Sequence, residues 1–308
     1  MKRRAWWAAL LAAVTLALAG SCDSVPVFLI RASDTPVRTA PQTLGHFRLD
    51  GNLENAEGTL EVTASSPDLE YRTLDSGAQV ATVGYPTQIV DASDRNEDGG
   101  VRPVLEIELP GERIPGTVSF RAHRLPLSSG ISMEDDGRVT AIVTVSTESN
   151  SMEGQVERWS APPERQLSAI VEFPKNTTEW MQSAVRADAR GHALRGGQIP
   201  SGQAANPTYH VALTIDAGGA ARLFVDGEES DRLLSYNYGP VPDTLYLLVA
   251  VDTHEREDSQ IDPDTGLETA TSELLSLAGV DNLRLYRHAL THEEVRRIYE
   301  TERQDSPP

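Results

Sequence analysis

The sequence contains a single cysteine, Cys22, among 308 residues. One thiol cannot form an intramolecular disulfide, so the stability of the protein has to come from its core. Positive charge is also scarce, because 27 Lys and Arg residues stand against 46 Asp and Glu residues, for a formal net charge of −19. This acidity argues against nucleic acid and anionic lipid as partners, since both carry dense negative charge. It permits cation binding without proving it, and a solvated acidic exterior that keeps an exported protein soluble is the simpler explanation.

Sequence motifs of common catalytic sites are missing too. There is no Gly-x-Ser-x-Gly, no His-Glu-x-x-His and no phosphate-cradling loop. Retaining glycoside hydrolases need two carboxylates about 5 Å apart, which a strand supplies from alternate positions. The nearest acidic clusters, Glu134–Asp136 and Glu255–Asp258, lack that spacing and have the composition of turns or loops. The sequence therefore predicts that the chain is not an enzyme, with a hydrolase that uses a non-standard carboxylate pair as the alternative.

The N-terminal segment has the features of an export signal. Basic residues stand in Met1–Arg4, and Ala5–Leu18 is almost wholly apolar and uncharged. That run is too short to span a bilayer comfortably and is typical of a cleaved signal. It ends in Leu18-Ala19-Gly20-Ser21-Cys22, which resembles the lipobox of bacterial lipoproteins. We therefore expect residues 1–21 to be removed and a lipid on Cys22 to hold the exported protein on a membrane; the alternative is an ordinary secretory signal with an incidental cysteine.

The rest of the chain has the composition of a tether followed by a β-rich domain. Residues 22–44 hold three prolines among small and polar residues, which predicts an extended tether. From residue 45 onward, apolar and polar residues alternate over short runs that end at Gly, Pro, Asn or Asp, as in strands with one buried face. The clearest such runs are Leu105–Leu109, Val118–Ala122, Val139–Val145 and Ala169–Phe173. The run Leu245–Val251 is apolar on both faces, which indicates a strand in the middle of a sheet.

Two segments have helical patterns. Thr291–Glu300 begins with a threonine that can cap the helix, and Glu294 stands at the reciprocal position of a capping box. Trp180–Ala189 is a weaker helix candidate. By contrast, residues 252–271 are acidic and nearly devoid of apolar side chains, which predicts a long exposed loop, and residues 303–308 are expected to form a disordered tail.

Three segments, in the right order, resemble the LamG-like jelly-roll family of the concanavalin A-like lectin and glucanase superfamily. Residues 46–58 resemble the family's opening strand, although Asn55-Ala56-Glu57-Gly58 stands where the family has Asp-Ser-Ser-Gly. Residues 210–227 are similar to a family hairpin in which a His-Val-Ala strand returns as a strand ending in Val-Asp-Gly. Residues 280–295 look like the closing strand and its capped helix. The resemblance implies a two-sheet jelly roll that spans most of the exported chain.

The resemblance also implies a calcium site, because LamG-like domains often hold one calcium between the opening turn and the closing strand. The matching positions are Asp50 and Asp281, and carboxylate oxygens suit this hard cation. The alternative is that both side chains cap turns by accepting hydrogen bonds from backbone amides. A weaker candidate is the run with Asp94, Asn96 and Asp98, which matches the first half of an EF-hand loop but lacks the acidic twelfth residue.

Ligand-binding residues are harder to find in the sequence. Jelly rolls support both lectins and hydrolases, so the fold class alone does not identify the function. Sugar sites commonly use an exposed aromatic platform. Beyond the signal the chain has two tryptophans, Trp159 and Trp180, and a loop-like segment carries Tyr236 and Tyr238. These four are weak candidates, with packing in the core or at its rim as the alternative.

Together these patterns predict an all-β fold, a two-sheet antiparallel jelly-roll sandwich with one short C-terminal helix. The expected organisation is a signal (residues 1–21), a tether (22–44), a LamG-like domain (45–302) and a tail (303–308). The leading functional hypothesis is a binding module, anchored in the bacterial cell envelope, that recognises carbohydrate or a surface protein, with calcium as a candidate cofactor. A glycan hydrolase and a purely structural envelope protein are the alternatives.

Overall fold

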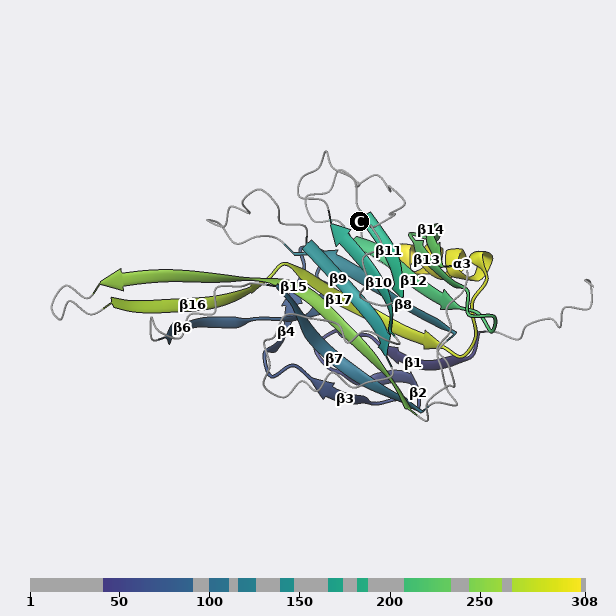
Figure 1. The fold of residues 1–308 in the computed structure, drawn as a ribbon, viewed down its shortest axis with the longest axis horizontal. Helices are drawn as coiled ribbons and strands as arrows, with labels where there is room; N and C mark the ends of the chain where they lie inside the picture. The colour runs from purple at the N-terminus through teal and green to yellow at the C-terminus, as the bar shows by residue number, and fades with distance from the viewer. Residues whose placement is uncertain are drawn as a thin grey trace, which may run out of the picture. The chain divides into compact units, whose positions relative to one another are not determined.

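The computed structural model describes residues 41–90, 100–110, 116–125, 139–146, 166–173, 182–187, 208–233, 244–261 and 268–305. These residues form two antiparallel sheets and a C-terminal helix, α3 (His292–Asp305) (Figure 1). The predicted fold class, an all-β two-sheet sandwich with one helix at its C-terminus, is confirmed. Within the described residues, no helix is long and apolar enough to cross a membrane.

The first sheet has nine strands and contains the strands of all three segments that resemble the LamG-like family. Its central strands are β12 (Thr208–Ile215), β8 (Thr117–Arg124), β17 (Ala278–Tyr286) and β1 (Thr43–Phe47). The sheet continues through β13 (Ala221–Val225) to β14 (Glu228–Leu233) on one side, and to β2 (Asn55–Gly58) on the other, while β5 (Gln79–Val83) joins β17 and carries β4 (Leu69–Thr73). The chain's first described strand therefore pairs with its last.

The second sheet has eight strands, and the longest of them is β15 (Thr244–Ile261). The remaining strands are β11 (Gln182–Ala187), β10 (Gln166–Phe173), β9 (Val139–Ser146), β16 (Glu268–Ser276), β6 (Tyr85–Val90), β7 (Gly100–Pro110) and β3 (Val62–Ser65). The first part of β15 lies between β7 and β9. This agrees with the prediction that a run apolar on both faces forms a central strand, since Leu247 and Leu248 are both buried although they face opposite sides.

One hydrophobic core lies between the two sheets. Phe47 and Phe120 enter it from the nine-stranded sheet, and Ile107 and Val143 enter it from the eight-stranded sheet. All four side chains are buried in a single cluster. Because side chains alternate between the faces of a strand, each of these strands also presents residues outward. Outward residues of the nine-stranded sheet line the cleft that is the candidate site.

Two of the predicted local structures are wrong. The helix predicted over 180–189 is strand β11, which pairs with β10 from Leu167 opposite Ala187 to Glu172 opposite Gln182. Pairing across a sheet can override the weak intrinsic preference of a short segment for a helix. The exposed loop predicted over 252–271 is largely the ladder between the second half of β15 and β16 (Figure 1). Backbone hydrogen bonds form this ladder, so it needs no apolar alternation that a sequence pattern could reveal.

The C-terminal helix was predicted well and begins where its capping box indicates. The Thr291 hydroxyl accepts a hydrogen bond from the Glu294 amide at 3.3 Å, and the Glu294 carboxylate accepts one from the Thr291 amide at 2.7 Å. Leu290 and Val295 are buried together with Ala212 on the outer side of the nine-stranded sheet. The helix reaches Asp305, beyond the predicted domain end at residue 302. At the other end, β1 starts within the predicted tether because Leu44 is apolar and buried.

Candidate functional site: a polar cleft on the outer face of the nine-stranded sheet

Strand alternation places charged residues on the outer face of β8. Val118, Phe120 and Ala122 point into the core and are buried. The residues between them therefore point outward, and they include Arg121 and His123. Both side chains lie next to the outer face of β17, because Arg121 is opposite Asp281 across the sheet.

A β-bulge in β17 brings two charged residues to the same face. The register between β17 and β8 shifts between Asp281 and Arg284, so one extra residue is accommodated there. The extra residue is Asn282, whose φ of 52° lies in the left-handed region, which asparagine tolerates better than most residues. Leu283 still enters the core. Without the bulge, Asp281 and Leu283 would share a face; with it, Asp281 and Arg284 both point outward.

A second left-handed residue lies beside the bulge. Leu49 has a φ of 60° and is fully buried, an unfavourable conformation for a branched side chain. The backbone carbonyl of its neighbour Arg48 accepts a hydrogen bond from the Asn282 amide at 2.9 Å. The His46 ring shares a 2.6 Å hydrogen bond with the Asn282 side-chain oxygen. The opening strand and the bulge therefore hold each other in place, and strained backbone of this kind is often found at functional sites.

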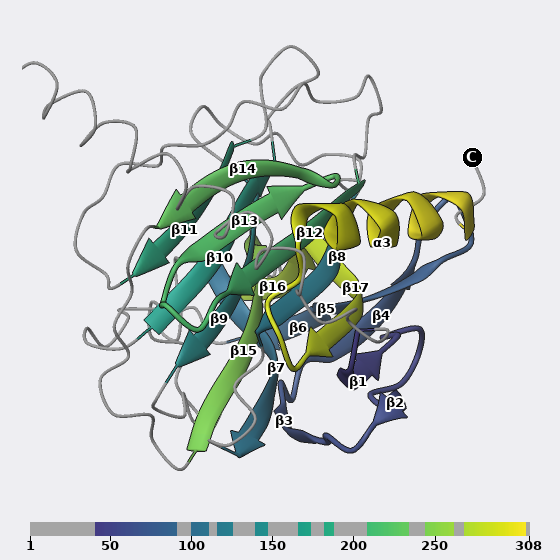
Figure 2. The ribbon, with the colours of Figure 1, turned by 90° about the vertical axis from the view of Figure 1, so that its right-hand side faces the viewer.

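The helix contributes a carboxylate to the same face. Along α3, Val295, Ile298 and Tyr299 follow the spacing of one helix face, and Glu302 continues it. Glu302 is 6% exposed although it is charged by type. Figure 2 shows α3 next to β12, β8 and β17 on the outer side of the sheet. A glutamate at the end of the docked face is therefore held against the polar surface of the strands.

These residues line one cleft of about 770 Å³. Its walls come from the opening strand and the residues after it, from β8, from β17, from the segment 74–79 and from the end of α3. The volume falls in the range of sites for small ligands, which is roughly 300–1,000 Å³. Most of the lining side chains are polar or charged. The cleft can therefore offer many hydrogen bonds to a polar ligand.

Asp281 is the best-supported charge in the cleft. Arg121 donates to both of its oxygens, at 2.8 Å from Nε and 2.5 Å from the terminal nitrogen. His123 Nε2 lies 3.1 Å from the same carboxylate, and His123 Nδ1 is 2.9 Å from the Thr208 hydroxyl, which orients the ring. Burial by itself raises the pKa of Asp281, but His123 and Arg121 outweigh it and lower the pKa below its ordinary value. Asp281 is therefore ionised and rigidly held.

Glu302 has the opposite character. Burial raises its pKa to about 7, against the lowering effect of Arg284 and Arg121, and the charge of Asp281 raises it further. The nearest Arg284 nitrogen is 3.6 Å from the Glu302 carboxylate. On its other side, His210 Nε2 lies 3.9 Å away, and burial lowers the pKa of His210 to about 3, so that ring is neutral. Of these two carboxyl groups, Asp281 is ionised, while Glu302 is half protonated at about pH 7 and mostly protonated below that pH.

The two residues predicted as calcium ligands do meet in this cleft. Asp50 and Asp281 both line it. The surroundings of Asp281 do not fit calcium, however, because both oxygens accept hydrogen bonds from Arg121 and a guanidinium group repels a cation. In the described part of the chain, no group of three or more His, Cys, Asp and Glu residues is placed to hold a metal ion. Asp281 therefore acts as an ion-pair partner in this structure.

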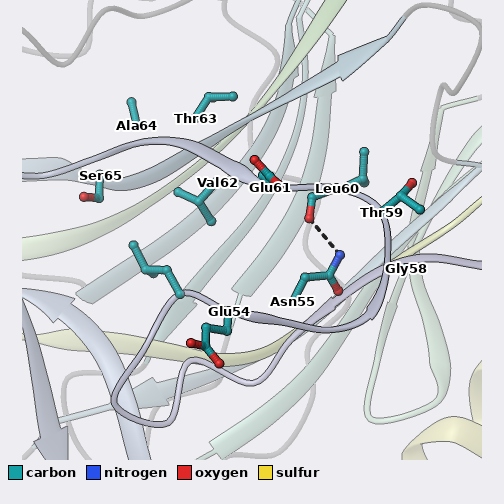
Figure 3. Close-up of a pocket in the computed structure, with 11 residues that line it drawn as sticks. Glu54, Asn55, Gly58, Thr59, Leu60, Glu61, Val62, Thr63, Ala64 and Ser65 are labelled. Atoms are coloured by element: carbon teal, nitrogen blue, oxygen red, sulfur yellow. Dashed lines mark hydrogen bonds between the residues drawn. The ribbon is translucent and has the colours of Figure 1, made fainter.

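A second hollow lies beside the opening turn, between β2 and β3, and has a volume of about 660 Å³ (Figure 3). Asn55, where the resembling family has an aspartate, lies at its edge. Its amide donates to the Leu60 carbonyl at 2.8 Å. Its oxygen accepts hydrogen bonds from the backbone amides of His46 at 2.9 Å and Glu57 at 3.1 Å. Both lone pairs of that oxygen are therefore used to hold the turn, which explains why asparagine serves here.

The other predicted site residues lie outside the described residues. They are the lipidation position Cys22, the weak metal candidates Asp94, Asn96 and Asp98, and the aromatic candidates Trp159, Trp180, Tyr236 and Tyr238. The structure does not test these predictions, and they remain predictions from the sequence.

Sequence reasoning missed several residues that the cleft depends on. Arg121 and His123 could have been found, since they alternate with Phe120 in a run already interpreted as a strand. Glu302 also carried a signal, because it falls at the helical spacing of the buried face that Val295 begins. Nothing local could have indicated that these residues meet, since they come from separate strands and a helix.

Comparisons with known proteins found similar solved structures at low sequence identity. No protein-family model and no curated protein matches the sequence. Among solved structures, the chain is similar to Trypanosoma rangeli sialidase, with a TM-score of 0.47 and 14% identity over 88% of this chain. It is also similar to the binding domain of botulinum neurotoxin serotype D/C, with a TM-score of 0.38 and 9% identity over 84% of this chain. The match spans 34% of the sialidase and 52% of the toxin domain.

The comparisons correct one prediction. The sequence predicts that the chain is not an enzyme, but several of the similar structures are sialidases, which are enzymes. The prediction is therefore withdrawn, and the likeness itself, at a TM-score of 0.47 and 14% identity, describes only the fold. The prediction rested on the absence of a carboxylate pair spaced along one strand. The cleft brings together Asp281 from a strand and Glu302 from a helix, an arrangement that a search along one strand does not detect.

Proposed function

We propose that this protein is a carbohydrate-binding protein that is exported and anchored by a lipid on Cys22, and that the polar cleft is its binding site. The observation that carries the proposal is the cleft itself: about 770 Å³, lined mainly by polar groups that separate strands and a helix hold in fixed positions. Sugars present many hydroxyl groups and little apolar surface. A site for them therefore needs several oriented donors and acceptors, which this cleft provides.

Preorganisation supports a binding role. His46 is fixed by Asn282, and His123 is fixed by both Asp281 and Thr208. Donors that are already oriented lose little conformational entropy when a ligand binds, so more of the interaction energy appears as affinity. Side chains carried on strands are also placed more accurately than side chains on loops. We further propose that the domain belongs to the LamG-like family, on the three sequence segments that come together in the nine-stranded sheet.

The binding proposal is tested by screening the full-length chain, purified in detergent, on an array of glycans. Wild type is compared with Arg284→Ala, which changes the cleft, and with Arg232→Ala. Arg232 is a matched control because it is 60% exposed and does not line the cleft. We expect wild type and the control to bind the same glycans and Arg284→Ala to lose at least tenfold in affinity. Equal binding by all three proteins would exclude the cleft as the site, and no binding by any would exclude the function.

The anchoring proposal has its own test. Cys22→Ser removes the thiol that would carry the lipid, so we expect the variant to leave the membrane fraction of the expressing bacterium. Mass spectrometry of the wild-type protein should show an N-terminus at Cys22 with a diacylglyceryl group. Membrane association that is unchanged in Cys22→Ser would contradict the lipoprotein assignment without touching the binding proposal.

A second candidate function, glycan hydrolysis, is favoured by one specific observation. Asp281 and Glu302 line the same cleft, and their surroundings move their pKa values in opposite directions. A protonated carboxyl group can donate a proton to the oxygen that leaves a glycosidic bond, while an ionised carboxylate stabilises the positive charge that develops on the sugar ring. Glu302 would be the acid and Asp281 the stabilising carboxylate.

Hydrolysis is tested by incubating the glycans that bind with the full-length chain and following the release of new reducing ends. We expect Glu302→Gln to abolish release while the glycan still binds, because glutamine has no proton to donate. The matched control is Glu300→Gln, which changes an exposed glutamate of the same helix. If wild type releases no reducing ends from any glycan that it binds, the hydrolase candidate is excluded and the binding proposal stands.

A further inference from the structure

The arginines of the cleft are unequally compensated. Arg121 is paired with Asp281 through two short hydrogen bonds, so its charge is cancelled locally. Arg48 is exposed, and no carboxylate of the described residues lies within ion-pair distance of it. Arg284 is 27% exposed and approaches one carboxylate, that of Glu302, at 3.6 Å. Arg284 also donates a hydrogen bond to the Asn282 side-chain oxygen at 3.4 Å and shares one with the Tyr286 side chain, but both of these partners are neutral. Arg48 and Arg284 therefore face the cleft without a close ion pair like that of Arg121 with Asp281.

The state of Glu302 decides how much of the Arg284 charge remains. Because the pKa of Glu302 is raised to about 7, its carboxyl group is at least half protonated at and below pH 7. The other groups that face Glu302 are Asp281 on β17, Arg121 on β8 and the neutral His210 on β12. None of these compensates Arg284 in place of Glu302, because Asp281 is already paired with Arg121. The cleft is lined by Arg48, Arg121 and Arg284 and by the carboxyl groups of Asp50, Asp281 and Glu302. It therefore has a net positive charge when Glu302 is protonated, although the chain as a whole carries −19.

The charges of Arg48 and Arg284 both affect the His46 ring. Burial lowers the pKa of this ring and the charges of Arg284 and Arg48 lower it further, while the hydrogen bond with Asn282 and the charge of Glu57 act in the opposite direction. Both guanidinium groups therefore lie near His46, one on the strand β17 and the other just after β1. The anchor that holds this arrangement is Asn282, which bonds to the His46 ring and to the Arg48 carbonyl. His46, Arg48 and Arg284 line the same cleft, so a ligand group bound beside His46 lies within reach of both guanidinium groups.

We infer that the cleft selects sugars that carry a carboxylate, and that Arg48 and Arg284 receive this group. The planar guanidinium fork matches the two oxygens of a carboxylate and pairs with it more strongly than with a hydroxyl. A neutral sugar would leave both guanidinium groups without a negative partner in a partly enclosed site. This inference rests on the proposed function and adds the chemical class of the ligand.

The test uses matched pairs of oligosaccharides that differ only at one carbon, which is a carboxylate in one member and a hydroxymethyl group in the other. Glucuronate against glucose and galacturonate against galactose, each at the end of the same oligosaccharide, are the probes. Affinities for the full-length chain in detergent are measured by titration calorimetry at pH 6.5. We expect the acidic member to bind at least tenfold more tightly in wild type. In the double variant Arg48→Gln and Arg284→Gln, the two members should bind equally.

Two controls separate the possible failures. The surface double variant Arg222→Gln and Arg232→Gln removes the same charge from side chains that are 49% and 60% exposed and do not line the cleft, so it should keep the wild-type preference. Replacing the salt of the titration buffer by sodium sulfate, with the ionic strength unchanged, should not abolish the preference of wild type for the acidic member of each pair. Equal affinity of wild type for both members of a pair would overturn the inference while the binding function stands. If wild type binds glycans on the array but binds neither member of these pairs, the inference is overturned, and only the absence of binding to every glycan overturns the proposed function. Loss of the preference in the surface variant would show a general charge effect, which also overturns the inference.

Discussion

Replacement of Glu302 by glutamine should change how the stability of the protein depends on pH. The pKa of Glu302 rises from 4.5 to about 7 on folding, a shift of roughly 2.5 units, and each unit corresponds to about 1.4 kcal/mol. A raised pKa means that the folded state holds the proton more tightly than the unfolded state. The favourable contribution is therefore complete below pH 4.5 and is lost as the pH rises through about 7. Wild type should lose roughly 3 kcal/mol from this group between pH 4.5 and pH 8.

Glutamine is neutral at every pH in this range, so Glu302→Gln should not show this loss. We expect the difference in the free energy of unfolding between the variant and wild type to grow by roughly 3 kcal/mol in favour of the variant from pH 4.5 to pH 8. Burial also raises the pKa values of Asp226 and Asp252 to about 6. Both residues are present in both proteins, so their contributions cancel in the difference.

Urea unfolding at 25 °C, at half-unit steps from pH 4.5 to pH 8.5, measures the effect. The control Glu300→Gln changes a residue that is 59% exposed, and its stability difference from wild type should stay within about 0.5 kcal/mol at every pH. A constant offset between Glu302→Gln and wild type is compatible with the reasoning, because glutamine forms different hydrogen bonds. A difference that does not change with pH would refute it, since it would mean that Glu302 has the same pKa in the folded and unfolded states.

Three further predictions concern other parts of the structure. Asp281→Asn should cost about 3–5 kcal/mol of stability in urea unfolding, because it removes the buried carboxylate charge that the partly buried Arg121 pairs with; a cost below 1 kcal/mol would show that the ion pair contributes little to stability. Thr291→Ala removes the helix cap and should cost about 1 kcal/mol, measured in the same way, whereas Thr291→Ser should cost less than half as much. Calcium should raise the Tm of wild type over a chelator control through Asp94 and Asp98, and the double variant Asp94→Asn and Asp98→Asn should remove the rise; an unchanged wild-type Tm would end the calcium proposal.

The strand pattern of the sequence predicted much of the fold because the pattern is local. Phe120 is buried because it alternates with polar residues along one strand, and the same is true of Ile107 in the other sheet. The register of the hairpin from β12 to β13 also follows the apolar pattern, with Val211 opposite Val225 and Leu213 opposite Leu223. Cross-strand pairs of this kind can be predicted from two neighbouring segments and a turn.

The failures have a common cause in long-range pairing. Residues 182–187 form a strand because β10 offers them a sheet edge, and their own composition does not require it. The second half of β15 pairs with β16 through its backbone, so its acidic side chains gave no sign of a strand. Intrinsic preferences of short segments differ by only about 1 kcal/mol per residue, which pairing in a sheet readily exceeds.

The amino-acid sequence alone determined which residues alternate between core and solvent and where the last helix begins, because both depend on neighbours a few positions away. Only the tertiary structure decided the composition of the cleft. Arg121 and Asp281 are 160 residues apart in the chain, and His46 and Asn282 are 236 apart. Their contacts depend on the order of strands in the sheet and on a single bulge in β17, and no local pattern carries that information.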